Sequence, residues 1–418
     1  MRPFLAMLAL RSAWNRRFTL ALTAASIALS AFMLLGVERI RGDLRDSFAS
    51  AVSGTDLIVG PRTGSVQLLL YAVFHVGSPR NNIGWDTVQA VAAQPAVAWV
   101  VPLSLGDSHR GFPVVGTSVQ IFERLRHGEQ QPLRFAAGGP FVQLFDAVLG
   151  AEVAERLGYG LGQRLTLAHG SGELEQDSHA DKPFGVVGVL ARTGTPIDRS
   201  VLISLQAMQA LHADWVGGMR LPGAAPAALP ADLTPRSVTA ALVGLQRRAQ
   251  VFSVQRWIND YRGEPVMAIL PGVAMDELWD VIGPGEQALL AMSGLVALVS
   301  MAGLVAVVLA GLNERRRELA VLRAVGAGPL QIVGLLALEG LWVTLAGLGL
   351  GLAALWAVIA AAGPWLQSEF GLGLRLAWPS AAQWGLLAAL LAAGVLASLV
   401  PGWRAYRLSL ADGLTPRT

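Results

Sequence analysis

The stretch QALLAMSGLVALVSMAGLVAVVLAGL at Gln287–Leu312, followed by NERRRELAVLRAVGAG at Asn313–Gly328, decides the fold. The first part is uncharged over 26 residues. At about 1.5 Å per residue, a helix of that length exceeds the roughly 30 Å thickness of a bilayer's hydrocarbon core. The second part holds four arginines and two glutamates. An apolar run that ends abruptly in arginines is typical of a transmembrane helix reaching a membrane surface.

Three more runs of the same kind lie in the chain. They are Phe18–Val37, residues 330–363, which only Glu339 interrupts, and residues 383–400, which we expect to end at Pro401. The first run is longer than the roughly 7–15 apolar residues of a signal peptide, so it predicts an uncleaved anchor. The sequence therefore predicts four transmembrane helices: TM1 at 18–37, TM2 at 287–312, TM3 at 330–363 and TM4 at 383–400.

The distribution of arginine predicts the orientation of these helices. The short segments 1–17, 313–329 and 404–418 hold 11 basic residues in 49 positions, whereas segment 38–286 holds 20 in 249. Because short basic segments stay in the cytoplasm, we expect both termini inside and segment 38–286 outside. The connection 364–382 is then a short external loop and 401–418 a cytoplasmic tail. Residues 1–17 mix apolar and basic side chains, which suits a helix lying on the cytoplasmic surface or a plain basic leader.

Segment 38–286 has the composition of an ordinary water-soluble domain. Short apolar runs that predict strands alternate with segments of helical periodicity. The expected strands are 56–60, 98–101, 112–115, 164–168, 184–190 and 200–204, and the expected helices are 86–93, 151–157, 205–211 and 254–261. Asp86 is a plausible helix N-cap. We expect a mixed α+β domain of two lobes, with a loop at 216–235, a hairpin tip at 170–181, and a helix or stalk with a break or hinge at Gly283-Pro284-Gly285.

Composition excludes several kinds of chemistry. The chain has no cysteine, which excludes disulfides and thiolate sites. Its only lysine, Lys182, is not in a phosphate-binding P-loop, so no nucleotide site of that type is expected. The net charge of +3 comes with arginines beside the apolar runs, the pattern of a membrane protein rather than of a nucleic-acid-binding protein.

No catalytic or metal-binding motif is visible either. The chain has no Gly-x-Ser-x-Gly elbow and no convincing paired-carboxylate site. The six histidines show no ligand spacing, so we expect surface or core histidines and assign no metal site, although folding could gather distant residues. Their positions are 75, 109, 127, 169, 179 and 212.

The segment Asn313–Gly328 closely resembles the cytoplasmic signature of the FtsX-like/MacB-like ABC permease family, R-x-x-E-x-x-x-L-R-A-x-G-A. The carboxyl end 401–414 is similar to the usual ending of that family, with Ser409 where proline is frequent. Residues 147–167 and 184–190 resemble parts of its external domain, with Gln163 where aspartate is frequent. The resemblance implies a mechanotransmission-type ABC permease: a membrane α-helical protein of four transmembrane helices, with a large α+β extracytoplasmic domain between helices 1 and 2.

The resemblance also implies partners and a place in the cell. ATP and magnesium would be bound by a separate ABC ATPase subunit, with no cofactor in this chain. A second copy of the chain would complete a homodimer in the bacterial inner membrane, and the client would be a periplasmic protein, a lipoprotein or another exported molecule. One alternative function is a transmembrane activator of an extracytoplasmic enzyme, without transport. Another is an external metalloprotein anchored by the membrane helices, which predicts stoichiometric metal in the purified domain. The external domain of about 249 residues is large for the first alternative.

Three sets of residues are the candidate functional positions. A short amphipathic coupling helix at 313–329 would dock on the ATPase, although its arginines alone would equally suit membrane anchoring. Glu339 is a carboxylate inside a membrane span, which suggests pairing with an arginine or another helix, a place near the headgroups, or a role in transport. Gly347 and Gly351 have the spacing for close helix packing, within the chain or between two copies. The coupling residues are Glu314, Arg315, Arg316, Arg317, Glu318, Leu319, Leu322, Arg323, Gly326 and Ala327.

Overall fold

The computed structural model of the chain describes residues 17–51, 53–77, 81–128, 130–170, 179, 181–212, 215–216, 219–220, 232–314, 324, 326–370 and 376–407. Two compact units emerge from the contacts. A helical unit comprises Met1–Asp43, Gly283–Trp365 and Leu374–Thr418. An external unit comprises Leu44–Ile282 and Leu366–Gly373. Each unit has its own hydrophobic core.

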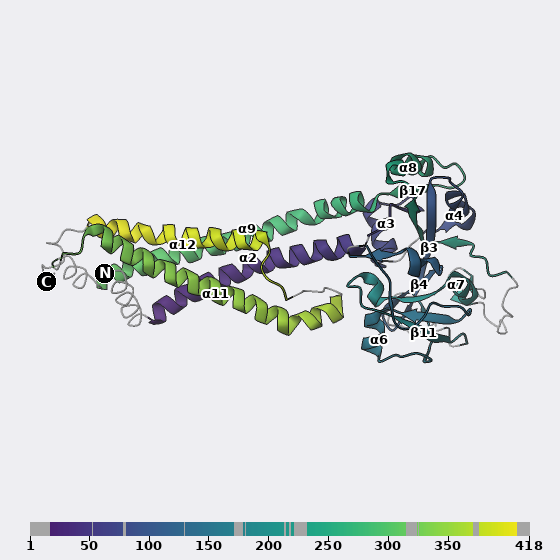
Figure 1. The fold of residues 1–418 in the computed structure, drawn as a ribbon, viewed down its shortest axis with the longest axis horizontal. Helices are drawn as coiled ribbons and strands as arrows, with labels where there is room; N and C mark the ends of the chain where they lie inside the picture. Colours follow the sequence, from purple (N-terminus) through teal and green to yellow (C-terminus); the bar gives the residue numbers. More distant parts are fainter. Residues whose placement is uncertain are drawn as a thin grey trace. The chain divides into compact units, whose positions relative to one another are not determined.

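The helical unit is a bundle of four long helices (Figure 1). They are α2 (Arg17–Ala51), α9 (Pro271–Glu314), α11 (Pro329–Phe370) and α12 (Ala381–Arg407). Each contains a segment long and apolar enough to cross a membrane: Arg17–Asp46, Pro271–Ala310, Leu330–Gly363 and Ala381–Val400. The fold class predicted from the sequence, four membrane helices with a large α+β domain between the first two, is therefore confirmed.

Four details of the predicted elements are wrong. Helix α9 is continuous through Pro284, so the expected break in the stalk is absent, and α12 continues past Pro401 to Arg407. Helix α11 extends to Phe370, into the segment expected to be an external loop. Asp86 lies in the first turn of α4 (Trp85–Ala92), whose N-cap is Gly84. Proline restricts the chain only locally, and packing along a long helix can override it.

One sheet runs through the described part of the external unit, in the strand order β17-β1-β16-β3-β4-β12-β8-β11-β7. Strand β9 pairs with β11, and β10 pairs with β3. Most neighbouring strands are antiparallel, but β12–β4 and β11–β8 are parallel. The strands are β1 (Leu57–Pro61), β3 (Val97–His109), β4 (Phe112–Thr117), β7 (Phe135–Gly138), β8 (Asp146–Leu149), β9 (Arg164–Leu165), β10 (Ala168–His169), β11 (Phe184–Leu190), β12 (Val201–Ser204), β16 (Ala240–Leu245) and β17 (Val266–Ile269).

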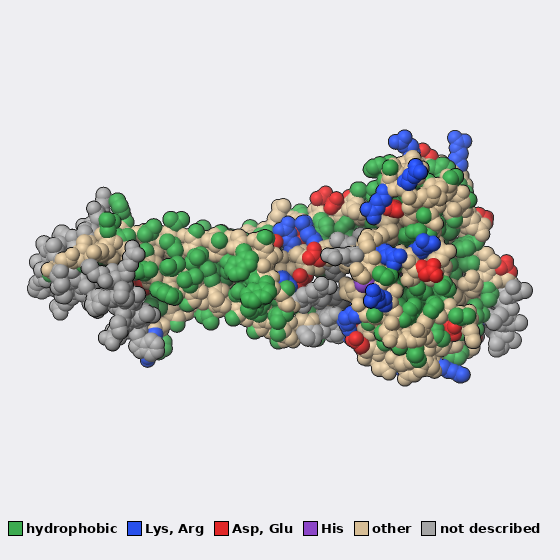
Figure 2. Space-filling model, in the orientation of Figure 1, with side chains coloured by type: hydrophobic (Ala, Val, Ile, Leu, Met, Phe, Trp, Pro, Cys, Tyr) green, Lys and Arg blue, Asp and Glu red, His purple; other side chains and the backbone are tan. Residues whose placement is uncertain are grey.

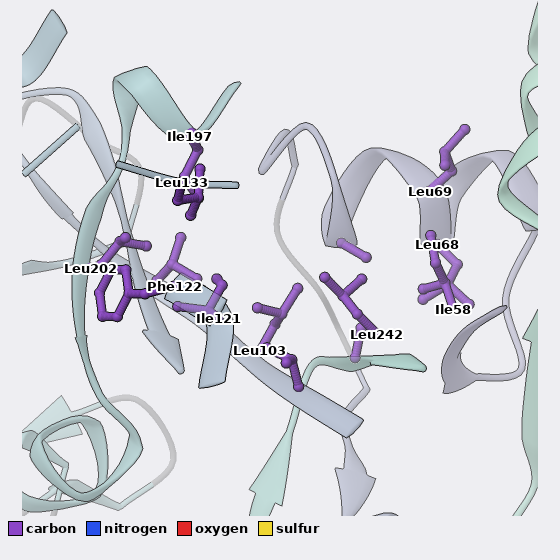
Figure 3. Close-up of a cluster of buried hydrophobic side chains, with 14 of the residues drawn as sticks. Ile58, Leu68, Leu69, Leu103, Ile121, Phe122, Leu133, Ile197, Leu202 and Leu242 are labelled. Carbon is purple, nitrogen blue, oxygen red and sulfur yellow. The ribbon is translucent and has the colours of Figure 1, made fainter. Parts of the chain in front are cut away.

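Strand β3 joins two halves of this sheet. Its residues 97–103 pair with β16 and its residues 103–109 pair with β4. Figure 3 shows that the core continues across both halves, from Ile58 and Leu68 through Leu103 to Phe122 and Leu202. The two lobes expected from the sequence are therefore halves of one sheet.

Short helices and two-stranded ladders complete the external unit. The helices are α3 (Ser65–Ala72), α4, α5 (Gln120–Arg124), α6 (Ala151–Leu157), α7 (Leu205–Leu211) and α8 (Val251–Asn259), with 3-10 turns at Pro196–Arg199 and Arg248–Gln250. The ladders pair β2 (Ile83–Gly84) with β15 (Ser237–Val238), β5 (Arg126–His127) with β6 (Gln131–Pro132), and β13 (Trp215–Val216) with β14 (Met219–Arg220). Helix α7 begins where the Ser204 hydroxyl accepts a hydrogen bond from the Ala207 amide.

Candidate functional site

Most of the predicted coupling helix lies outside the described residues. The predicted coupling residues outside the described residues are Arg315, Arg316, Arg317, Glu318, Leu319, Leu322 and Arg323. The expected surface helix before Arg17, most of the loop expected at 216–235 and most of the hairpin tip expected at 170–181 also lie outside the described residues. Glu314 is the last residue of α9. Ala324 and Gly326 are exposed, and Gly326 has a φ of 103°, a conformation that favours glycine. The segment 324–328 thus leads from this region into α11.

Glycines place α11 directly against α2. A Cβ atom added to Gly347 would lie 2.7 Å from the Ile27 Cβ and 2.9 Å from the Ala24 carbonyl oxygen. At Gly351 it would lie 2.6 Å from the Ala28 carbonyl oxygen. These distances are shorter than a side chain tolerates, so the two glycines allow the backbones to approach. The face they form is therefore occupied by α2 of the same chain.

Polar side chains connect the other helices of the bundle. The Ser30 and Ser300 hydroxyls are 2.8 Å apart and join α2 to α9. The Gln383 amide donates to the Leu35 carbonyl oxygen at 3.0 Å and joins α12 to α2. Glu339 is only 6% exposed inside the bundle. In an apolar core, these two hydrogen bonds favour a specific arrangement of α2, α9 and α12.

Charged side chains of the helical unit gather where α2 and α9 leave the apolar zone, as Figure 2 shows for one face. Arg39 pairs with Asp43 at 3.0 Å. Arg41 lies 3.3 Å from Glu38 and 3.2 Å from Glu286, which joins α2 to α9. This is the end of the bundle expected to face outward. An arginine held by two carboxylates fixes the two helices to each other at that level.

The external residues that resemble the family motif form β8 and α6. Gly150 connects them, and its amide donates to the Ser200 carbonyl oxygen at 2.9 Å. Any side chain at Gly150 would collide with the backbone of Ile197 and Asp198. Asp198 is buried and accepts hydrogen bonds from the Thr193 and Gly194 amides. The segment 193–199 thus connects β11 to β12 and includes the 3-10 turn Pro196–Arg199.

Three of the six histidines meet beside one aspartate in the external unit. One side-chain ligand atom from each of Asp107, His169, His179 and His212 lies within 4.8 Å of the other three. His169 Nδ1 is 3.0 Å and His212 Nε2 is 3.3 Å from Asp107 Oδ1. We call these four residues the histidine cluster. The sequence does not predict it, because its members are up to 105 positions apart and no spacing links them.

Strand pairing explains how the cluster forms. Asp107 on β3 lies directly opposite His169 on β10 in an antiparallel ladder. The β3–β4 register shifts between Leu105 and Asp107, where Gly106 has a φ of 156°. Such a bulge turns the following side chain to a new direction. His212 follows the carboxyl end of α7, whose N-cap Ser204 ends β12.

Asp107 and the neighbouring histidines change one another's pKa values. Burial raises the pKa of Asp107, but hydrogen bonds with His169 and His212 lower it more, to about 2. Burial lowers the pKa of His212, but its contact with Asp107 raises it above the usual histidine value. For His179, burial lowers the pKa. Asp107 is therefore a carboxylate at neutral pH and attracts positive charge to this point.

The other histidines lie apart from the cluster. His109 Nδ1 is 2.7 Å from the Thr166 carbonyl oxygen and its Nε2 is 3.2 Å from the Tyr159 hydroxyl. His75 Nδ1 is 2.9 Å from the Ser200 hydroxyl. His127 is in the short strand β5.

Comparison with known proteins identifies relatives of both units. A family model described as the MacB-like periplasmic core domain matches residues 20–255, more than half of the chain. A second model, described as FtsX-like permease C-terminal, matches residues 290–410. No curated protein matches the chain in sequence.

Two solved structures are also similar. The periplasmic region of MacB from Actinobacillus actinomycetemcomitans is 10% identical, with 55% of this chain and 97% of that chain covered and a TM-score of 0.33. The extracellular domain of the noncanonic ABC-type transporter YknZ from Gram-positive bacteria is 13% identical, with 51% and 98% covered and a TM-score of 0.30. Because both family models match the chain and the chain has four candidate membrane helices, it belongs to the FtsX-like/MacB-like ABC permease family.

Proposed function

We propose that this chain is the transmembrane subunit of an ABC transporter. Separate ATPase subunits would bind ATP and Mg²⁺, and this chain would convert their movement into a conformational change of its external unit that exports or extracts a client. The observation that carries the proposal is the continuity of α9, a single helix from Pro271 to Glu314. Its 44 residues make a rod of about 66 Å, which transmits a displacement from one end to the other.

The ends of two helices support the proposed coupling segment. Glu314 ends α9, and α11 begins at Pro329, so the arginine-rich residues between them connect two apolar helices. A short charged connection of this kind suits docking into a groove of a partner protein. The match of residues 290–410 to the FtsX-like permease model includes this connection. We therefore assign the contact with the ATPase to Glu314–Glu318, Leu319, Leu322, Arg323, Gly326 and Ala327.

We further propose a homodimer in the bacterial inner membrane, with both termini in the cytoplasm and the external unit in the periplasm. Support for the orientation comes from the arginine-rich segments 1–17, 313–329 and 404–418, which the positive-inside rule assigns to the cytoplasm. Large apolar side chains on the outside of α9, such as Leu295 and Val299, are more than 60% exposed. They face lipid or a second copy of the chain.

Co-purification tests the docking of the ATPase. The triple variant Arg315→Ala, Glu318→Ala, Arg323→Ala should lose recovery of an ATPase from membranes of the native host, because the charged groups of the contact are gone. A matched triple variant in the external unit, Glu155→Ala, Arg164→Ala, Arg192→Ala, removes exposed charges of the same signs and should retain recovery. Equal ATPase recovery with both variants would contradict docking through this segment.

A further inference from the structure

We propose that the histidine cluster binds one divalent first-row transition metal ion, and that Zn²⁺ is the ion that fits it. Its donors are one carboxylate and three imidazoles, which are the ligands that Zn²⁺ takes in cysteine-free sites. The four ligand atoms already lie within 4.8 Å of one another. No large rearrangement is therefore needed to bring them around one ion.

Three of the four ligand atoms form a nearly equilateral triangle. Asp107 Oδ1 is 3.0 Å from His169 Nδ1 and 3.3 Å from His212 Nε2, and the two nitrogens are 3.2 Å apart. With zinc–ligand bonds of about 2.0–2.1 Å, the edges of a tetrahedral site measure about 3.3–3.4 Å. The triangle is thus one face of such a tetrahedron to within about 0.4 Å, and His179 supplies the fourth corner.

Hydrogen bonding alone explains this triangle poorly. His212 Nδ1 lies 3.0 Å from the Met208 carbonyl oxygen, which can only accept, so Nδ1 carries a proton. In the neutral ring, Nε2 then presents a lone pair to the Asp107 carboxylate at 3.3 Å, although it can accept a hydrogen bond from His169 Nδ1 at 3.2 Å. A metal ion turns that repulsion into three coordinate bonds. A backbone carbonyl that accepts from the second nitrogen of a ligand histidine is also the usual support for metal-binding histidines.

The alternative is a buried ion pair between protonated His212 and Asp107. That arrangement satisfies Oδ1 but leaves the other carboxylate oxygen unexplained. Asp107 Oδ2 is buried and accepts no hydrogen bond from the described residues. It also leaves His169 Nδ1 3.0 Å from an oxygen that His212 Nε2 approaches to 3.3 Å, with the two nitrogens 3.2 Å apart. The geometry therefore favours a cation among the four side chains.

Backbone hydrogen bonds hold His179, and two of the four ligands are partly exposed. The His179 amide donates to the Leu167 carbonyl oxygen at 2.8 Å, and the Lys182 amide donates to the His179 carbonyl oxygen at 3.0 Å. Asp107 and His179 are buried, whereas the side chains of His169 and His212 are about a third exposed. An ion can enter past those two rings. Once bound, it would tie β3, β10 and the end of α7 together.

Metal analysis of the purified full-length chain tests the site. The chain carries no histidine tag and is kept in detergent micelles, where a chelator removes any bound metal. Calorimetry then measures the binding of added Zn²⁺. After desalting, mass spectrometry counts the metal ions bound per chain. We expect about one Zn²⁺ per chain. His212→Gln and Asp107→Asn should each weaken binding at least about 100-fold, because even an outer-shell change costs about 10–100-fold. Mg²⁺ and Ca²⁺, which prefer oxygen ligands, should not compete.

The control variant is His127→Gln, which removes a histidine outside the cluster and should leave the Zn²⁺ stoichiometry and affinity unchanged. Circular dichroism of each variant shows whether it folds. If the cluster variants fail to fold, the wild-type chain decides: X-ray absorption should show four nitrogen and oxygen ligands at about 2.0–2.1 Å, three of them imidazoles. A wild-type chain without stoichiometric Zn²⁺, or binding equally strong in folded His212→Gln, would overturn the proposal. The outcome does not depend on ATPase docking.

Discussion

Protonation of the His75 side chain should change the stability of the external unit. Burial lowers the pKa of its imidazole to about 4, whereas an unfolded chain titrates near 6.5. Between these values the unfolded chain binds a proton that the folded chain does not, so stability falls as the pH drops from about 6.5 to 4. The backbone at His75 has a φ of 53°, a conformation that asparagine also tolerates.

We therefore expect His75→Asn to reduce the pH dependence of unfolding. Each pKa unit is worth about 1.4 kcal/mol, and because the residue is partly exposed we expect the wild type to lose on the order of 2 kcal/mol from this group between pH 7 and pH 4. Thermal unfolding of the full chain in micelles at several pH values measures the effect. His127→Asn is the control, and an identical pH profile for His75→Asn and the wild type would show that His75 does not contribute.

At the scale of helices, the packing of α2 on α11 depends on two glycines. Gly347→Ala should destabilise the bundle by about 1–3 kcal/mol, because the new methyl group would overlap Ile27 and the Ala24 carbonyl. Gly349→Ala is the matched control, since a Cβ there meets nothing within 4 Å. It should be neutral or slightly stabilising, because alanine favours helix more than glycine. Unfolding in mixed micelles measures both, and equal losses would contradict the packing seen at Gly347.

At the scale of the whole molecule, the absence of cysteine makes the orientation directly measurable. Val142 in the external unit is 89% exposed, and Ala324 within the coupling segment is also exposed. In intact cells of a Gram-negative host with a permeable outer membrane, Val142→Cys should react with a membrane-impermeant maleimide. Ala324→Cys should react only after the inner membrane is opened. The reverse pattern would place the arginine-rich segment outside and remove the basis for ATPase docking.

Local patterns in the sequence predict much of this fold because they reflect local physics. The uncharged runs give the four membrane helices, and the expected helices 151–157 and 205–211 coincide with α6 and α7. Strand β16 and the order of the sheet are not predicted, since strand neighbours depend on long-range packing. The histidine cluster is missed for the same reason: only the pairing of β10 with β3 brings His169 to Asp107.

Strand β3 links the unfolding of the two halves of the external unit. It contributes to both halves of the sheet, through residues 97–103 and 103–109. If either half separated from β3, the hydrophobic cluster that contains Leu103, Leu202 and Ile58 would become exposed to water. The halves are thus one cooperative folding unit, and heating should give a single transition for this part of the chain instead of two.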